Sequence, residues 1–82
     1  MISMITTSRR KPQETFPEIV KNHGERIYNL ALMKCNQVEL AEDICQETFI
    51  RVYKGLEKFR DEAQLGTWIY RIALNVCHTM IK

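Results

Sequence analysis

The sequence lacks the features that mark membrane-spanning proteins and disulfide-rich secreted proteins. No apolar run approaches the roughly 18 residues that are needed to cross a bilayer. The N-terminal segment MISMITTSRRKPQ carries its basic residues after its apolar ones, which is the reverse of a secretory signal. The three cysteines, Cys35, Cys45 and Cys77, are an odd number without C-x-x-C spacing, which is typical of a reducing compartment. We therefore expect a cytoplasmic protein without membrane insertion.

Signatures of catalysis and of metal binding are also missing. The sequence has no Gly-rich phosphate loop, no H-E-x-x-H motif and no Ser-His-Asp or Cys-His set with an activated nucleophile. A zinc site that combines the cysteines with His23 or His78 is conceivable, but metal ligands usually come in closely spaced pairs. A role as a small apolar packing residue is favoured, for Cys45 in particular. We expect no enzymatic activity, no cofactor and no metal.

Neither sign of charge dominates the sequence. It has 12 Lys and Arg residues and 10 Asp and Glu residues, which gives a formal net charge of +2. This excess is too small to imply nucleic-acid binding, so a binding surface has to be inferred from the positions of the charges. The 82 residues, 45% of them apolar, suffice for one globular domain with one core.

The apolar pattern is helical, and no run of alternating β-branched residues is long enough to predict a strand. We predict a flexible leader over residues 1–12 and helices over 13–33, 38–56 and 68–81, with a polar connection at 58–66. Short connections favour antiparallel neighbours. The predicted fold is therefore an all-α, compact bundle of three main helices within a domain that spans 13–82.

Local signals refine these helices. Pro17 suits a first turn, and Gly24 can bend or split the first helix. A break is expected at Cys35-Asn36-Gln37, and Thr67 is the expected N-cap of the third helix. The predicted core positions are Phe16, Ile19, Val20, Ile27, Leu30, Ala31, Ala41, Ile44, Cys45, Thr48, Phe49, Val52, Leu56, Ile69, Ile72, Ala73, Val76 and Met80.

Acidic residues gather on the second predicted helix, within a span, 36–50, that contains no Lys or Arg. Carboxylates near a helix N-terminus are favoured by the helix dipole, so capping electrostatics alone can explain them. The functional interpretation is an acidic face for a partner rich in Arg, because residues at three- and four-residue spacing project together. This face comprises Glu39, Asp43, Gln46, Glu47 and Ile50.

Basic residues follow directly: Arg51, Lys54, Lys58 and Arg60 stand against one acidic residue, Glu57, in the ten residues from 51 to 60. A solvated surface is the ordinary explanation. The alternative is a surface that binds single-stranded nucleic acid. Such surfaces combine basic residues, which contact the phosphates, with aromatic rings, which stack on the bases. The aromatic residues in question are Tyr53, Phe59, Trp68 and Tyr70. Trp68 and Phe59 are better explained as core or loop anchors, and Tyr70 is the freer ring.

Two segments closely resemble region 2 of the extracytoplasmic function (ECF) sigma factors, which belong to the sigma-70 family of bacterial RNA polymerase subunits. These are AEDICQETFIRVYKGLEKF and, after a short loop, TWIYRIALNVC. The resemblance extends from about Phe16 to Lys82. It implies a non-catalytic initiation subunit that couples polymerase docking to opening of the promoter −10 element.

The resemblance also implies roles for individual residues. Asp43, Gln46 and Glu47 match positions that dock on the clamp helices of the largest polymerase subunit. The loop from Asp61 to Thr67 matches a pocket for a flipped base of the non-template strand, and an anti-sigma factor is an expected partner. The residues expected to serve −10 DNA are Arg60, Asp61, Leu65, Thr67, Trp68, Tyr70, Arg71 and Asn75.

The sequence departs from the family pattern in the loop FRDEAQLGTW, which lacks a glycine after the arginine and has Leu65 in place of an aromatic residue. The family's second DNA-binding domain, which reads the −35 element, is also absent from these 82 residues, so we expect that this chain alone does not direct transcription fully. Two other functions stay open. One is a helical protein-interaction module without a DNA role, and the other is a helix-turn-helix repressor that binds duplex DNA.

Overall fold

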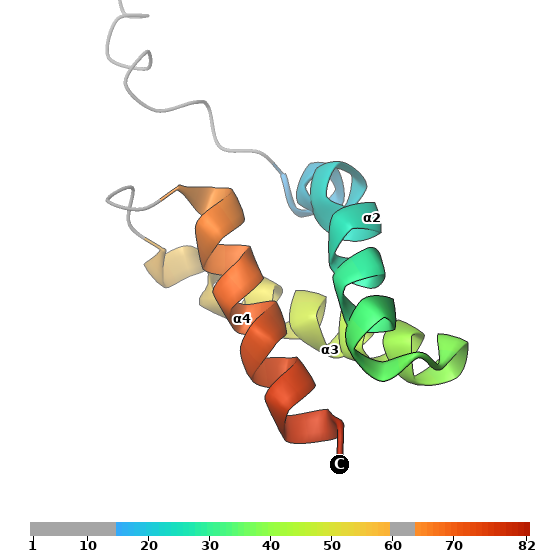
Figure 1. Ribbon diagram of the computed structural model, residues 1–82. Helices are drawn as coiled ribbons and strands as arrows, with labels where there is room; N and C mark the ends of the chain where they lie inside the picture. The colour runs from blue at the N-terminus through green and yellow to red at the C-terminus, as the bar shows by residue number, and fades with distance from the viewer. Residues whose placement is uncertain (1–14, 60–63) are drawn as a thin grey trace, which may run out of the picture.

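Helices make up the described part of the molecule. The computed structural model describes residues 15–59 and 64–82, and within these ranges it contains three α-helices, one short 3-10 helix and no strand (Figure 1). The elements are α2 (Phe16–Cys35), α3 (Val38–Gly55), η1 (Leu56–Lys58) and α4 (Leu65–Met80). The predicted all-α bundle of three main helices is confirmed. The expected leader, together with Arg60 and Asp61, lies outside the described residues.

A capping box fixes the start of α2. The Glu18 backbone N–H donates to Thr15 Oγ1 at 3.3 Å, and the Thr15 N–H donates to Glu18 Oε1 at 3.0 Å. Pro17 occupies the first turn, where its missing N–H costs no hydrogen bond. The helix runs through Gly24 as one element, so the possible split does not occur.

The break between α2 and α3 falls where it was predicted, at Asn36 and Gln37. Asn36 is in the left-handed region with φ of 55°, a conformation that Asn tolerates better than most residues, and its N–H donates to the Leu32 carbonyl at 2.8 Å. Gln37 is the N-cap of α3 and makes no side-chain cap bond. Glu39 in the first turn places a negative charge at this positive helix end.

The prediction that Thr67 caps the third helix is wrong. Helix α4 begins three residues earlier than predicted, at Leu65, with Gln64 as its N-cap, and the Trp68 N–H donates to the Gln64 carbonyl at 3.1 Å. Leu65 is partly buried against the core, which favours starting the helix at that residue. Thr67 is consequently an exposed residue of the first turn.

All three helices contribute to the core. Helix α3 crosses behind α2 and α4 in the view of Figure 1 and packs against both, and α2 and α4 also touch each other. Ile72 packs against both groups of buried side chains, whose members are Ile19, Ile27, Phe49, Val52, Ile69 and Ala73 in one group and Ala31, Ala41, Ile44, Val76 and Cys77 in the other. Val20, predicted to lie in the core, is 37% exposed, and Cys77 takes a core position that the prediction omitted.

Candidate functional site

The predicted acidic face lies on α3, on the side away from its buried stripe. Four of its five members are exposed, and the fifth, Glu47, is half-buried. Ile50, the apolar member, is 47% exposed. The helix that carries this face is held from behind by the core residues Ala41, Ile44, Thr48, Phe49 and Val52. The structure therefore brings Glu39, Asp43, Gln46, Glu47 and Ile50 together on one accessible surface of a rigid element.

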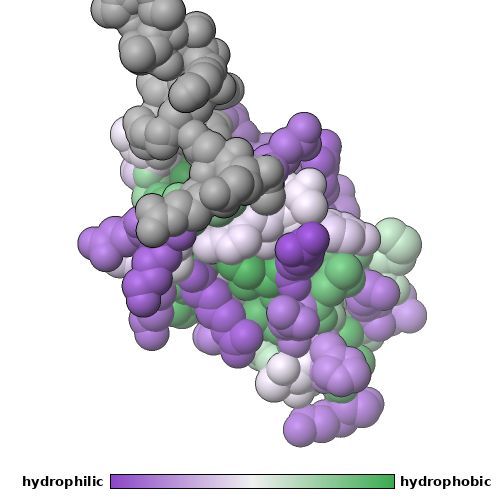
Figure 2. Space-filling view, turned by 90° about the vertical axis from the view of Figure 1, so that its left-hand side faces the viewer, coloured by the Kyte–Doolittle hydropathy of each residue, from purple (hydrophilic) through white to green (hydrophobic). Residues whose placement is uncertain are grey.

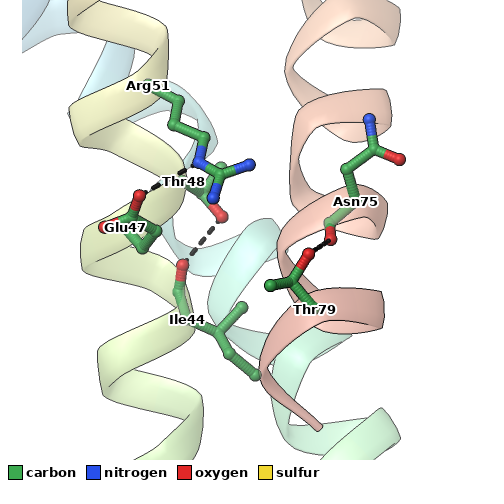
Figure 3. Close-up of polar contacts among 6 residues, drawn as sticks. All are labelled: Ile44, Glu47, Thr48, Arg51, Asn75 and Thr79. Atoms are coloured by element: carbon green, nitrogen blue, oxygen red, sulfur yellow. Dashed lines mark hydrogen bonds and ion pairs between the residues drawn. The ribbon is translucent and has the colours of Figure 1, made fainter.

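One carboxylate of this face already has an intramolecular partner. Arg51 Nε donates to Glu47 Oε2 at 3.0 Å across one turn of α3 (Figure 3). Exposed pairs of this kind contribute about 0.3–0.5 kcal/mol and are readily exchanged for other partners. Within the described residues, no cation lies within salt-bridge distance of Glu39, Glu42 or Asp43.

Next to the acidic face, an open groove of about 710 Å³ lies between α2 and α3. We call it the α2/α3 groove. Nearly all of its surface is apolar, and it runs from Phe16 and Tyr53 at one end to Tyr28 and Glu42 at the other. The sequence analysis did not predict it, because it forms only where the flanks of two helices meet.

The aromatic residue Phe16 forms one end of this groove. Its ring meets the ring of Phe49 edge-on, with centroids 6.5 Å apart, and that of Tyr53, with centroids 5.1 Å apart. Phe49 is buried, whereas Tyr53 is 64% exposed. Tyr53 was considered with the aromatic residues of a nucleic-acid surface, but the structure puts it in the α2/α3 groove instead.

Trp68 and Phe59 form a separate aromatic pair, with ring centroids 4.8 Å apart. Trp68 is partly buried against the core. A Cβ atom at Gly55 would lie 3.0 Å from Trp68 Cζ2, so the ring packs directly on the backbone at the end of α3. This packing fits the interpretation of Trp68 as an anchor that ties the start of α4 to the end of α3. Leu65 also packs against the core, whereas Thr67 is exposed.

The other predicted DNA residues on α4 are exposed but point in more than one direction. Tyr70, which is 44% exposed, borders a hollow beside Leu30 and Met33 of α2. Asn75 points its amide away from α3, and its backbone carbonyl accepts a bond of 2.9 Å from Thr79 Oγ1 (Figure 3). Arg71 is exposed one residue after Tyr70. A ligand that touched Tyr70 and Asn75 together would have to wrap around part of the helix.

The face drawn in Figure 2 shows how the surface chemistry is mixed. Patches of apolar side chains are exposed there between hydrophilic ones, so a partner that covers this face would meet both kinds of surface.

The cysteines are free thiols that serve packing. Burial raises the pKa of the Cys77 thiol, an effect that the nearby Lys34 ammonium opposes, and burial also raises the pKa of the Cys45 thiol. Over residues 15–59 and 64–82, no group of three or more His, Cys, Asp or Glu side chains is arranged to hold a metal ion. None of the described helices is both long enough and apolar enough to cross a membrane.

Comparison with known families identifies the fold. The family model for sigma-70 region 2 matches residues 19–82, which include all of α3 and α4 and most of α2. The chain belongs to the sigma-70 region 2 family. No solved structure matches the chain significantly.

Individual relatives of this region 2 domain are ECF sigma factors. The chain is 38% identical over 74 residues to the ECF RNA polymerase sigma factor SigW of Bacillus subtilis, covering 90% of this chain and 40% of SigW. It is 32% identical over 76 residues to SigE of Mycolicibacterium smegmatis, covering 93% of this chain and 29% of SigE. The resemblance to the ECF group is therefore confirmed, and the chain spans less than half the length of these relatives.

Proposed function

We propose that this domain is the region 2 part of an alternative sigma factor, in which α3 docks on RNA polymerase and α4 with its preceding loop recognises and melts the promoter −10 element. It acts in transcription initiation by binding the polymerase and the promoter, and it catalyses no reaction of its own. It acts in the cytoplasm, where an anti-sigma factor is an expected regulator. The family match over 19–82 is the observation that carries this proposal.

The acidic face supports the docking role through its exposure and its charge. Carboxylates on a surface attract a basic partner over several ångströms and steer its approach. Glu39 and Asp43 are exposed without a described cation beside them, so they can exchange water directly for Arg or Lys side chains. We assign the clamp helices of the largest polymerase subunit as the partner of this face.

The exposed residues of α4 support the DNA role. Tyr70 offers a ring for stacking, Arg71 offers a cation for phosphate, and the Asn75 amide can pair with a base edge. Their spread around the helix suits a splayed single strand better than the flat edge of a duplex. Flipping a base costs a few kcal/mol, which stacking and phosphate contacts together can offset.

Charge reversal tests the docking role. We expect the double variant Asp43→Arg, Glu47→Arg to lose binding to core RNA polymerase and to its isolated clamp-helix fragment, while circular dichroism shows unchanged helicity. The matched control is Glu25→Arg, an exposed carboxylate on α2 outside the acidic face. Equal polymerase affinity for the parent and the double variant would refute the docking role.

Titration with labelled −10 oligonucleotides tests the DNA role and separates it from the other two functions. We expect salt-dependent binding to the single non-template strand that exceeds binding to the duplex. A protein-interaction module without a DNA role would show no such binding, and a helix-turn-helix repressor would prefer the duplex.

A further inference from the structure

We propose that the hollow between α2 and α4 docks an amphipathic helix of a partner protein, one that carries aliphatic side chains on one face and Asp or Glu along its flank. We call it the α2/α4 hollow. It has a volume of about 760 Å³ and shares no lining residue with the α2/α3 groove. Its wall on α2 includes Leu30, Met33 and Lys34, and its wall on α4 includes Tyr70, Leu74 and His78. The inference goes beyond the proposed function, in which only Tyr70 of these residues has a role.

The first argument is the apolar surface that the hollow leaves open. Met33 is 72% exposed and Tyr70 is 44% exposed, and both line the hollow. Leu30, Leu74 and Ile81 line it as well and are only half-buried. Single exposed apolar residues are ordinary, but several around one hollow form a patch whose burial is favourable. A partner with aliphatic side chains can therefore bind there.

The second argument is the shape of the hollow. Helices α2 and α4 lie side by side in front of α3 (Figure 1). Tyr70, Leu74 and His78 recur every four residues on α4 and form one row along it. This row is about 12 Å long, or roughly two helical turns. Leu30 and Lys34, also four residues apart, form the facing row on α2. An amphipathic helix of a few turns fits between two such rows.

The third argument is the charge around the hollow, which has one sign. Residues 26–38 and 64–82 contain no Asp or Glu. Lys34 lines the hollow, and its ammonium opposes the rise that burial causes in the pKa of the Cys77 thiol. Within the described residues, no carboxylate lies within salt-bridge distance of Lys34. Arg26 and Arg71 are exposed, one turn before Leu30 and one residue after Tyr70. A flank of Asp or Glu would be attracted by these cations, whereas a basic partner would be repelled.

Three other occupants fit less well. The chain's own N-terminal segment, 1–14, has three basic residues and one acidic residue, so it would meet like charges. A second copy related by a two-fold axis would place one basic surface against another. A single-stranded nucleic acid would match the charge, but its bases stack on aromatic rings. Tyr70 is the one ring among the described residues that line the hollow.

The test is a fluorescence-anisotropy titration of the full 82-residue chain with a labelled synthetic peptide of about four helical turns. The peptide carries leucines at three- and four-residue spacing and glutamates along the flank of this leucine face. A scrambled peptide of the same composition keeps the charge but loses the apolar face. We expect the parent to bind the amphipathic peptide at least about tenfold more tightly than the scrambled one.

Variants of the hollow locate the binding. Lys34→Glu should weaken peptide binding about tenfold, and Met33→Ser about fivefold. Both side chains are exposed, so neither change removes a core contact. The matched controls are Lys21→Glu, an exposed cation of α2, and Val38→Ser, a side chain that is 55% exposed on α3. Neither control residue lines the hollow, and both controls should bind within about twofold of the parent.

Other outcomes would overturn the inference. Equal affinity for the amphipathic and the scrambled peptide would show that charge alone causes binding. Unchanged peptide affinity in both Lys34→Glu and Met33→Ser would place the peptide elsewhere on the domain. If both variants weaken binding of an oligothymidine strand but not of the peptide, the hollow belongs to nucleic acid. Self-association of the parent that Met33→Ser abolishes would assign the hollow to a second copy.

One consequence rests on the proposed function, because Tyr70 also belongs to the proposed DNA surface. A helix in the hollow would cover this ring, so saturating amphipathic peptide should displace a labelled −10 strand from the parent. If the peptide binds in the hollow while the strand stays bound, the DNA role of Tyr70 fails and the docking assignment stands. If the parent binds no −10 strand at all, the proposed DNA role fails, and the peptide titration still decides the docking assignment.

Discussion

Phe49 and Tyr53 provide a direct test of which aromatic side chain holds the bundle together. They lie four residues apart on α3, and both rings contact Phe16 edge-on. They differ in burial, because Phe49 is 7% exposed and Tyr53 is 64% exposed. Truncating each to alanine therefore compares a core residue with a surface residue that shares the same aromatic partner.

The expected loss for Phe49→Ala follows from its surroundings. Truncation of a buried Phe costs about 3–5 kcal/mol, including the cavity that it leaves. Phe49 borders the α2/α3 groove, from which water and neighbouring side chains can enter the space, so we expect about 3 kcal/mol. For 82 residues, typical stabilities per residue give a total of about 4–12 kcal/mol. The variant should remain folded at low temperature but melt about 12–24 °C below the parent.

Urea titration followed by circular dichroism at 222 nm measures the effect. We expect Tyr53→Ala to lose less than about 1 kcal/mol, chiefly from its ring contact with Phe16. The slope of the unfolding free energy against urea should be similar in all three proteins, which would indicate that the folded states are equally compact. Equal losses for the two variants, or a Phe49→Ala variant that melts with the parent, would refute the assignment of Phe49 to the core.

Three further predictions concern the DNA surface, the helix cap and the thiols. Arg71→Ala should weaken binding to all −10 strands alike and reduce the slope of the logarithm of the binding constant against the logarithm of salt concentration by about 0.7. Asn75→Ala should instead relax the base preference at one position of the strand. Identical titration curves for both variants and the parent would contradict these roles. Thr15→Ala should lower the free energy of unfolding, measured by urea titration, by about 1 kcal/mol, and Thr15→Ser should keep most of that stability. An unchanged free energy of unfolding in Thr15→Ala would show that the capping box does not stabilise the fold. The unfolded Cys77 thiol loses its proton near its ordinary pKa of 9.0, while burial raises the folded pKa, so its contribution to stability should be complete below about pH 9 and decline above it. Stability curves against pH for the parent and Cys77→Ala should therefore diverge in shape only at alkaline pH, and parallel curves would contradict the shift.

Helix positions were largely predictable because they depend on local signals. The spacing of apolar residues predicted all three helices, and the polar Asn36 marked the break between the first two. The start of α4 was not predictable from capping preference, since packing of Leu65 against the core outweighed the good N-cap residue Thr67. Local preferences are weak compared with tertiary burial, and boundaries are where the two compete.

The candidate site was predictable only in part. The acidic face follows from spacing on one helix, so its exposure could be anticipated. The α2/α3 groove depends on how Val20 of one helix faces Ile50 of another, which no periodicity reveals. Tyr53 was grouped with basic neighbours in sequence, but the 100° rotation between successive residues directs its ring toward Phe16.

The contact between Gly55 and Trp68 links two positions that are thirteen residues apart. Ordinary carbon contacts begin near 3.5 Å, so the 3.0 Å approach leaves no room for a methyl group at residue 55 unless the indole ring moves. A side chain at residue 55 therefore requires the indole ring of Trp68 to shift by a few tenths of an ångström. In an alignment of relatives, an alanine or larger residue at the position of Gly55 should accompany a smaller ring, or a tilted start of the last helix, at the position of Trp68.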